Sequence, residues 1–210
     1  MIKIGITQRV ENVAAYSERR DALDQRWALF FERLDMLIIP LPNRIEDFSK
    51  YVTEIGLDGV VLSGGNDLAS QENGVNIALE RDALEKQIIT ICIDKNIPLL
   101  GICRGMQIIN EYFGGQLSKV SGHVAVTHEV SFTDSDLINR KFEVNSFHNY
   151  GILPQQLGKG LKSIALANDA TVEGLRHATQ NILGLMWHPE RHDPFSVNDQ
   201  EIITHFFKKN

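Results

Sequence analysis

Apolar runs and helix-like periodicity alternate along the first half of this chain. A short run of consecutive apolar residues is typical of a strand buried on both faces, whereas apolar residues repeated every three or four positions are typical of an amphipathic helix. By these criteria the chain begins with a strand and then alternates between the two kinds of element. The predicted strands are Ile2–Thr7, Met36–Leu41, Gly59–Ser63 and Ile97–Ile102, and the predicted helices are Ser17–Leu34, Asn43–Gly56, Ile77–Lys95 and Arg104–Phe113.

Polar residues and a glycine mark the expected ends of two of these helices. Ser17 is expected to cap the first one, because a serine side chain accepts a hydrogen bond from the free N–H groups of a helix start. Asn43, with Glu46 three residues later, resembles a capping box and predicts the start of the second helix. Gly56 predicts its end, since glycine readily adopts the left-handed conformation of a C-terminal cap.

The second half of the chain is richer in short strands and closes with a helix. The alternation in the first half predicts an α/β fold of flavodoxin-like type, with a mostly parallel central sheet flanked by helices. The second half adds short antiparallel strands. Ligands of such sheets bind beyond the carboxyl ends of the strands. The elements predicted here are strands at Thr127–Phe132, Phe142–Ser146, Leu161–Ala167, Thr171–Arg176 and Ile182–Trp187, and a helix at about Asp199–Lys208.

Composition and charge narrow the range of functions. The chain has 210 residues, of which 43% are hydrophobic and 23% charged, so we expect residues 1–210 to form a single domain. The net charge of −6 argues against nucleic acid and anionic membranes as partners. Met1–Thr7 is typical of a strand and not of a signal peptide, and no segment approaches the roughly 18 apolar residues of a membrane span. We therefore expect a cytoplasmic protein whose two cysteines are reduced.

Cys103 directly follows an apolar strand and stands between two glycines, Gly101 and Gly105. This layout is that of a nucleophile elbow, a sharp strand-to-helix turn whose strained nucleophile needs small neighbours. The turn places the thiol at a helix N-terminus, where the macrodipole and free N–H groups stabilise a thiolate. A buried structural thiol is the alternative for Cys103, and it is the interpretation we favour for Cys92, which lies among isoleucines of a predicted helix.

His188 and Glu190 are the candidates for the base that a thiol nucleophile needs and for the group that orients this base. They follow another apolar strand, in the motif Trp-His-Pro-Glu. A metal site formed by His188, Glu190 and His192 is the alternative, because residues two apart on a strand share a face. Pro189 would interrupt such a strand, so the sequence favours the catalytic role and predicts no metal.

Two backbone N–H groups are candidates for an oxyanion hole, which stabilises the negative oxygen formed when a carbonyl is attacked. One belongs to Arg104, the residue after the candidate nucleophile. The second is expected from Gly64 and Gly65 after the third strand, since glycine lets the backbone approach a substrate closely. A simple strand-ending turn is the alternative for this glycine pair.

Four motifs occur in the order found in class I glutamine amidotransferase-like proteins. They are Ser-Gly-Gly-Asn-Asp, Gly-Ile-Cys-Arg-Gly-Met-Gln, Val-Asn-Ser-Phe-His and Trp-His-Pro-Glu. Within that family the chain most resembles γ-glutamyl hydrolases of the γ-glutamyl-GABA hydrolase type, over nearly its whole length. The resemblance implies the class I glutamine amidotransferase architecture and a catalytic triad of Cys103, His188 and Glu190. It also implies an oxyanion hole formed by the main chains of Gly65 and Arg104.

The resemblance further implies which residues bind the glutamyl end of the substrate. Gln107, one turn beyond the nucleophile, matches a residue that holds the amino-acid end. The glutamyl carboxylate and amine need hydrogen-bond partners of both kinds. Tyr150 stands where the family often has glutamine, two residues after the histidine of the binding segment. That segment consists of Asn145, Ser146, Phe147 and His148.

Arg9 is the candidate for binding an anionic part of the substrate. It lies at the end of the first strand, on the expected rim of the site, and a guanidinium binds phosphate or carboxylate in bidentate fashion. A solvated arginine paired with Glu11 or Glu18 is the alternative. The short chain with Thr-Gln-Arg at this point is similar to hydrolases that release CDP-amidate from γ-glutamyl-CDP-amidate, in making the phosphoramidate groups of a surface capsule.

Two other groups of polar residues carry weaker signals. His123 and His128 flank the loop that follows the helix behind Cys103, and they are candidates either for a lid over the substrate or for ordinary hydrogen-bonded histidines. Arg19 and Arg20 open the predicted first helix, where we expect one solvated and one ion-paired side chain.

Two functions share every catalytic residue. The first is a free-standing hydrolase that cleaves the γ-glutamyl C–N bond of a small conjugate through a γ-glutamyl thioester, without metal or organic cofactor. Its expected substrate is γ-glutamyl-CDP-amidate or a γ-glutamyl-GABA-like compound. The second is a glutaminase subunit that passes ammonia to a partner synthase. We see no synthase domain in the chain, which favours the hydrolase. An intact triad argues against a third function, that of a binding or regulatory module that has lost catalysis. The sequence leaves open whether the protein forms a homodimer.

Overall fold

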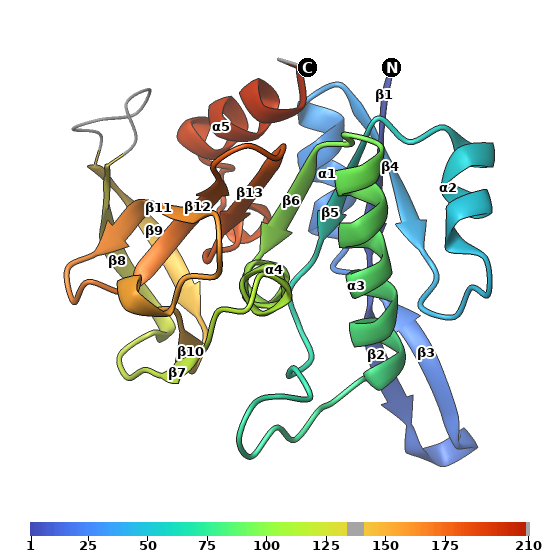
Figure 1. The fold of residues 1–210 in the computed structure, drawn as a ribbon, viewed down its shortest axis with the longest axis horizontal. Coiled ribbons are helices and arrows are strands. Elements are labelled where there is room, and N and C mark those ends of the chain that lie inside the picture. Colours follow the sequence, from blue (N-terminus) through green and yellow to red (C-terminus); the bar gives the residue numbers. More distant parts are fainter. Residues whose placement is uncertain (134–140, 209–210) are drawn as a thin grey trace.

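The strands of the protein form one large mixed sheet and two small ones in the computed structural model, which describes residues 1–133 and 141–208. The large sheet has nine strands in the order β4-β1-β5-β6-β13-β12-β11-β8-β9. The first five are parallel to one another, and the others are antiparallel to their neighbours (Figure 1). The parallel strands are β1 (Ile2–Thr7), β4 (Met36–Leu41), β5 (Gly59–Leu62), β6 (Leu99–Ile102) and β13 (Ile182–Leu185), and the antiparallel ones are β8 (Val124–Phe132), β9 (Lys141–Phe147), β11 (Leu161–Ala167) and β12 (Val172–His177).

Two short antiparallel pairs, β2–β3 and β7–β10, lie outside the large sheet. Helices and 3₁₀ turns connect the strands, and among the described residues none of the helices is long and apolar enough to cross a membrane. These elements are β2 (Arg9–Val13), β3 (Glu18–Ala22), β7 (Ser118–Lys119), β10 (Tyr150–Gly151), α1 (Arg26–Arg33), α2 (Phe48–Ile55), α3 (Leu79–Asp94), α4 (Arg104–Tyr112), α5 (Val197–Lys208), η1 (Ala14–Tyr16), η2 (Pro154–Gln156) and η3 (Pro189–Arg191).

The parallel strands are apolar on both faces because each face packs against helices. In β5, Val60 and Val61 are both buried but belong to different cores, since successive side chains of a strand point to opposite faces. One core packs against α1 and α5, where Trp27 and Ile203 are buried. The other packs against α2, α3 and α4 (Figure 1). This arrangement confirms the predicted α/β fold with a mostly parallel sheet flanked by helices.

The predicted helix Ser17–Leu34 is wrong in its first half. Residues 9–22 form the β2–β3 hairpin instead, and Ser17 adopts a left-handed conformation at its turn (φ 51°) rather than capping a helix. The physical reason is that residues 18–21 carry only charged side chains, so a helix there would have no apolar face to bury. The chain is helical only from Arg26, where the aromatic rings of α1 enter the core.

The helix α2 begins later than predicted. Asp47 caps it, with a side chain that accepts a hydrogen bond from a backbone N–H of the first turn (2.9 Å). Asn43, the expected cap, is buried, and its amide donates to the carbonyl of Gln8 (2.9 Å) and the carboxylate of Asp21 (2.8 Å). Gly56 ends the helix in a left-handed conformation (φ 65°), as predicted.

Candidate active site

Cys103 lies at a sharp turn between β6 and α4. Its backbone angles (φ 51°, ψ −105°) fall outside the ordinary regions for a residue with a side chain, as expected of a nucleophile elbow. The turn is closely packed. A Cβ atom on Gly105 would lie 2.0 Å from the carbonyl oxygen of Leu62, and one on Gly101 would lie 2.6 Å from the carbonyl of Gly105. Both glycines are therefore required by the space available.

The Cys103 thiol is buried, yet its pKa lies below that of an ordinary cysteine. Burial by itself raises the pKa, but His188 lowers it, followed by His148 and the backbone N–H of Arg104. Cys92 provides the contrast within the same chain. It packs into the core from α3, where burial raises its pKa to about 12, so the predicted role in core packing is confirmed.

His188 follows β13, which pairs in parallel with β6, so the sheet brings it beside Cys103. Its Nδ1 atom lies 2.7 Å from Oε1 of Glu190, which belongs to η3. Burial lowers the pKa of His188, but Cys103 and Glu190 raise it to about 9. The site thus favours a thiolate beside an imidazolium. The alternative metal set is not assembled, because Nδ1 of His192 instead faces Asp199 (3.5 Å).

The backbone around His188 is fixed by contacts that sequence reasoning missed. The side chain of Asn145 donates to the His188 carbonyl (2.7 Å) and accepts from its N–H (2.9 Å). Arg26 of α1 donates to the carbonyl oxygens of Glu190 (2.7 Å) and His192 (2.5 Å). The Asn145 amide, expected among the groups that bind the glutamyl end, is therefore engaged with the candidate base.

The loop after β5 is held from behind by Arg81. The guanidinium donates to the three carbonyl oxygens of residues 63–65, at 2.5 to 3.2 Å. In a trans peptide the N–H points opposite to the preceding carbonyl, so the N–H of Gly65 is directed away from Arg81. On the other side of the loop, a Cβ atom on Gly64 would lie 2.6 Å from the ring of His188. This loop geometry fits an N–H donor that points toward the thiol.

Arg81 belongs to a network of buried charges behind the elbow. Its Nε donates to a carboxylate oxygen of Glu85 (2.9 Å), which also accepts from the hydroxyl of Thr7 (2.8 Å). The side chain of Arg104 is ion-paired with Glu85 and with Asp82. Burial lowers the pKa of Arg81 to about 10, while the two arginines hold the pKa of Glu85 below its usual value despite the opposing effect of burial. The network thus supports both segments that carry the expected oxyanion donors.

Most of the residues expected to bind the glutamyl end are hydrogen-bonded within the protein. The side chain of Gln107 donates to the carbonyl of Tyr150 (2.8 Å), and Nδ1 of His148 lies 3.0 Å from the same oxygen. Ser146 is buried, and its hydroxyl donates to a backbone carbonyl (2.8 Å). Phe147, in contrast, is 41% exposed, and its ring centroid lies 5.9 Å from that of the candidate base. The guanidinium of Arg191 lies over this ring, 4.5 Å from its centroid, and the exposed part of Phe147 is accessible to a substrate.

Arg9 begins the hairpin beside the glycine loop. A Cβ atom on Gly65 would lie 3.1 Å from Cδ of Arg9, so the two residues are in contact. The Nε atom of Arg9 forms an ion pair with Glu11 (2.9 Å), and both side chains are nearly half exposed. Arg19 and Arg20 of the same hairpin are ion-paired as well. The Arg9 guanidinium is therefore paired, and it lies at the rim of the expected oxyanion hole.

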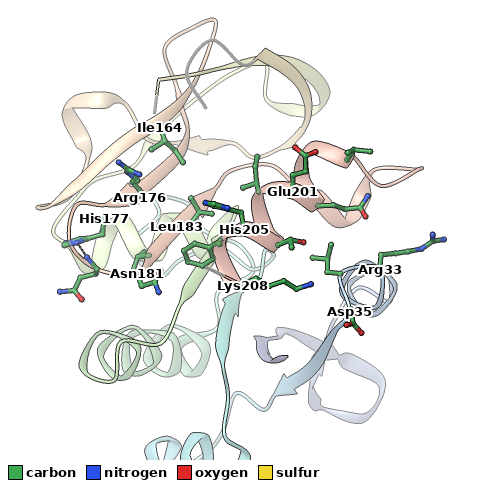
Figure 2. A pocket seen from close by; sticks show the side chains of 18 of the residues that line it. Arg33, Asp35, Ile164, Arg176, His177, Asn181, Leu183, Glu201, His205 and Lys208 are labelled. Atoms are coloured by element: carbon green, nitrogen blue, oxygen red, sulfur yellow. Dashed lines mark hydrogen bonds between the residues drawn. The ribbon is translucent and has the colours of Figure 1, made fainter. Parts of the chain in front are cut away.

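A large depression lies elsewhere on the molecule (Figure 2). It measures about 1340 Å³, and Asn181, Leu183 and His205 are among the residues that line it. The depression lies at the amino end of β13, whereas Cys103 follows the carboxyl end of the neighbouring parallel strand β6. None of the candidate catalytic residues lines it.

Similarity to known proteins identifies the family. The family model for peptidase C26 matches residues 4–190. The chain belongs to the peptidase C26 family. A γ-glutamyl-CDP-amidate hydrolase of Campylobacter jejuni is 42% identical over 206 residues, which cover 97% of this chain and 96% of that protein. One subunit of a glutamine-hydrolysing GMP synthase of Methanocaldococcus jannaschii is 28% identical over 153 residues, 71% of this chain and 72% of that protein.

A solved structure shows the same fold. A glutamine amidotransferase of Thermotoga maritima shares the fold with a TM-score of 0.68 at 18% identity, covering 97% of this chain and 82% of that one. The predicted class I glutamine amidotransferase architecture is confirmed. So is the predicted enzyme class, since the peptidase C26 match and the similarity to the C. jejuni hydrolase indicate a hydrolase that acts on C–N bonds.

Proposed function

We propose that the protein hydrolyses a γ-glutamyl nucleotide amidate of the γ-glutamyl-CDP-amidate type, as one free-standing cytoplasmic domain of residues 1–210. The observation that carries the proposal is the assembly of Cys103, His188 and Glu190 beside the Gly65 loop, with the half-exposed Arg9 at its rim. The 42% identity to the C. jejuni hydrolase extends over 97% of the chain and supports a nucleotide amidate as leaving group.

In the first half of the proposed reaction, the Cys103 thiolate attacks the γ-carbonyl carbon and a C–S bond forms. The backbone N–H groups of Gly65 and Arg104 hold the resulting oxyanion. The C–N bond then breaks as the His188 imidazolium gives its proton to the departing nitrogen. Glu190, hydrogen-bonded to Nδ1 of His188 at 2.7 Å, keeps the ring oriented and stabilises its positive charge.

In the second half, water attacks the γ-glutamyl thioester. Neutral His188 removes a proton from this water, a C–O bond forms, and the C–S bond breaks to regenerate the Cys103 thiolate. Glutamate leaves as the second product. Every proton and electron pair in these steps belongs to the substrate, to water or to the three named side chains, so the proposed chemistry uses no cofactor.

The glutamyl end is proposed to bind between Gln107 and the segment 145–148. Within that segment Phe147 offers an exposed ring beside His188, whereas Asn145 acts by positioning the His188 backbone. Gln107 and His148 share the carbonyl of Tyr150 and so fix the geometry of this end of the site.

A substrate panel tests the proposal. We expect kcat/KM to be highest for a γ-glutamyl nucleotide amidate, lower for γ-glutamyl-GABA and lowest for glutamine, measured as glutamate release. Arg9→Ala is expected to raise KM for the amidate about tenfold, because a charge-assisted hydrogen bond contributes about 1.5–3 kcal/mol. Arg20→Ala is the matched control, since Arg20 lies in the same hairpin and is paired with Glu18.

Two results would overturn parts of this proposal. Turnover of free glutamine alone, stimulated by an added synthase, would favour the alternative of a glutaminase that serves a synthase, for which the similarity to the M. jannaschii GMP synthase is the supporting observation. An equal KM for the amidate in the Arg9→Ala and Arg20→Ala variants would exclude Arg9 from substrate binding.

The pH profile reports on the thiolate–imidazolium pair. Because the pKa of His188 is about 9, kcat/KM is expected to fall above about pH 9, where the proton donor is lost. Glu190→Gln removes one of the charges that raise this pKa, so the alkaline limb should move to lower pH, by about one unit. Glu129→Gln, an exposed residue paired with Lys141, should leave the limb in place. An unshifted limb in Glu190→Gln would contradict the proposed role of Glu190.

A further inference from the structure

Three histidines surround one buried carboxylate outside the catalytic centre. Glu173 of β12 is fully buried, and its two oxygens accept no hydrogen bond of standard geometry. Facing them are Nδ1 of His123 (3.6 Å), Nε2 of His128 (3.4 Å) and Nε2 of His148 (3.5 Å). These separations exceed the 2.7–3.2 Å of an ordinary hydrogen bond. The three rings therefore face the Glu173 carboxylate at distances slightly longer than an ordinary hydrogen bond.

A β-bulge aims two of these histidines at the same point. His123 directly precedes β8 and His128 lies within it, so their separation of five residues would place them on opposite faces of a regular strand. Between Val124 and Val126, however, the register with β9 shifts, and Ala125 has a φ of 54°. The extra residue reverses the alternation of side chains. The two rings consequently lie together, with centroids 4.9 Å apart.

In two of the rings, the nitrogen that points away from Glu173 lies beside a hydrogen-bond acceptor. This outer contact favours the tautomer whose inner nitrogen, the one that faces Glu173, carries no proton. Nε2 of His123 lies 2.8 Å from a carboxylate oxygen of Asp169, and Nδ1 of His148 lies 3.0 Å from the carbonyl of Tyr150. A neutral ring that donates its N–H outward presents a lone pair inward, toward Glu173. Where such a lone pair faces a carboxylate, a proton or a metal ion between the two removes their repulsion. Metal-binding histidines commonly donate their second N–H to a carboxylate or a backbone carbonyl in this way.

We propose that His123, His128 and Glu173 form a site for a divalent metal ion of the zinc class. One ligand atom from each residue lies within 4.8 Å of the others. In a tetrahedral site with bonds of about 2.0–2.1 Å, neighbouring ligand atoms are about 3.4 Å apart. The N···O separations are close to this value, at 3.6 Å from Nδ1 of His123 to Oε1 of Glu173 and 3.4 Å from Nε2 of His128 to Oε2 of the same carboxylate. Imidazole and carboxylate are ligands that zinc accepts readily.

This site goes beyond the proposed hydrolysis, whose steps use no metal. The ion would cross-link the start of β8 to β12 in the antiparallel half of the sheet. His148 lies beside it, and belongs to the segment proposed to bind the glutamyl end. His128 is the more accessible of the two histidine ligands, with a side chain 17% exposed, and provides the side from which the ion enters.

Metal content of the full chain tests the site. Because thiolates are good zinc ligands, the measurements use a Cys103→Ser background. After treatment with a chelator, the protein is titrated with Zn²⁺ by calorimetry and with Co²⁺ by visible absorption. We expect one equivalent of metal and the intense visible bands of tetrahedral Co²⁺. Added His128→Asn or Glu173→Gln should weaken binding at least tenfold, and Asp169→Asn about tenfold, by releasing the outer partner of His123.

His177→Asn provides the matched control, because this histidine lies in β12 as well but outside the cluster. Its metal affinity should equal that of the background protein. His128→Asn replaces a partly exposed side chain, so its fold can be verified by circular dichroism before titration. No stoichiometric binding in the background protein, or equal binding in the His128→Asn and His177→Asn variants, would overturn the proposal and leave a cluster that shares protons only.

Discussion

Cys103→Ala is expected to lower kcat/KM for a γ-glutamyl amide by about 10⁴-fold or more. The reason is that the proposed reaction proceeds through a thioester on this sulfur, and no other described nucleophile lies at the elbow between β6 and α4. Glutamate release measures the loss. Rapid quenching of the wild-type protein with substrate should reveal a γ-glutamyl adduct on the peptide that contains Cys103, and the variant should show none.

Cys92→Ala is the matched control for this experiment. Its thiol has a pKa of about 12 and packs in the core, so its removal should reduce stability by about 1–2 kcal/mol and leave kcat/KM within about twofold. Full activity in Cys103→Ala, or an adduct on Cys92, would refute the assignment of the nucleophile.

Arg81→Met is expected to produce the largest loss of stability, about 3–5 kcal/mol in the free energy of unfolding. The substitution leaves the buried Glu85 without one of its two arginine partners. It also removes the donor from the carbonyl oxygens of residues 63–65, so the loop that carries Gly65 loses its support. Where the variant folds, kcat should fall about 10²-fold with a smaller change in KM, because oxyanion stabilisation acts in the transition state.

The control for Arg81→Met is Lys86→Met on the same helix. Lys86 forms an exposed ion pair with Glu111, and exposed pairs contribute about 0–1 kcal/mol. Urea unfolding and steady-state kinetics of the two variants separate the effects. Similar unfolding free energies for the two variants would show that the buried network does not hold the fold together.

The candidate nucleophile and base could be located from the sequence because each follows an apolar strand of the parallel half. Their chemistry depends on neighbours in the chain, such as the glycines on either side of Cys103, and on the pairing of adjacent parallel strands. The same reasoning failed at residues 18–21, where the predicted helix extends over four consecutive charged residues that form a hairpin strand instead. Periodicity shows which residues share a face, but it does not show whether a core exists for that face.

The groups that support the site could not be predicted in the same way. Arg81 contacts a loop 16 to 18 residues earlier in the chain, and Arg26 contacts a carbonyl 164 residues later. The pattern of neighbouring residues in the sequence does not indicate contacts between residues so far apart in the chain. His123 and His128 were singled out, but a bulge at Ala125 determines that they face the same carboxylate, and alternation along a strand predicts the opposite.

The two hydrogen bonds between Asn145 and the backbone of His188 have a consequence for protein engineering. Asn145 belongs to β9, the strand at the far edge of the antiparallel half, whereas His188 follows a parallel strand. Deleting the antiparallel strands to obtain a minimal catalytic unit would therefore remove both hydrogen bonds that position the His188 backbone, even though the strand before His188 remained intact. A smaller hydrolase based on this fold must keep β9 or provide other hydrogen bonds that position the backbone of His188.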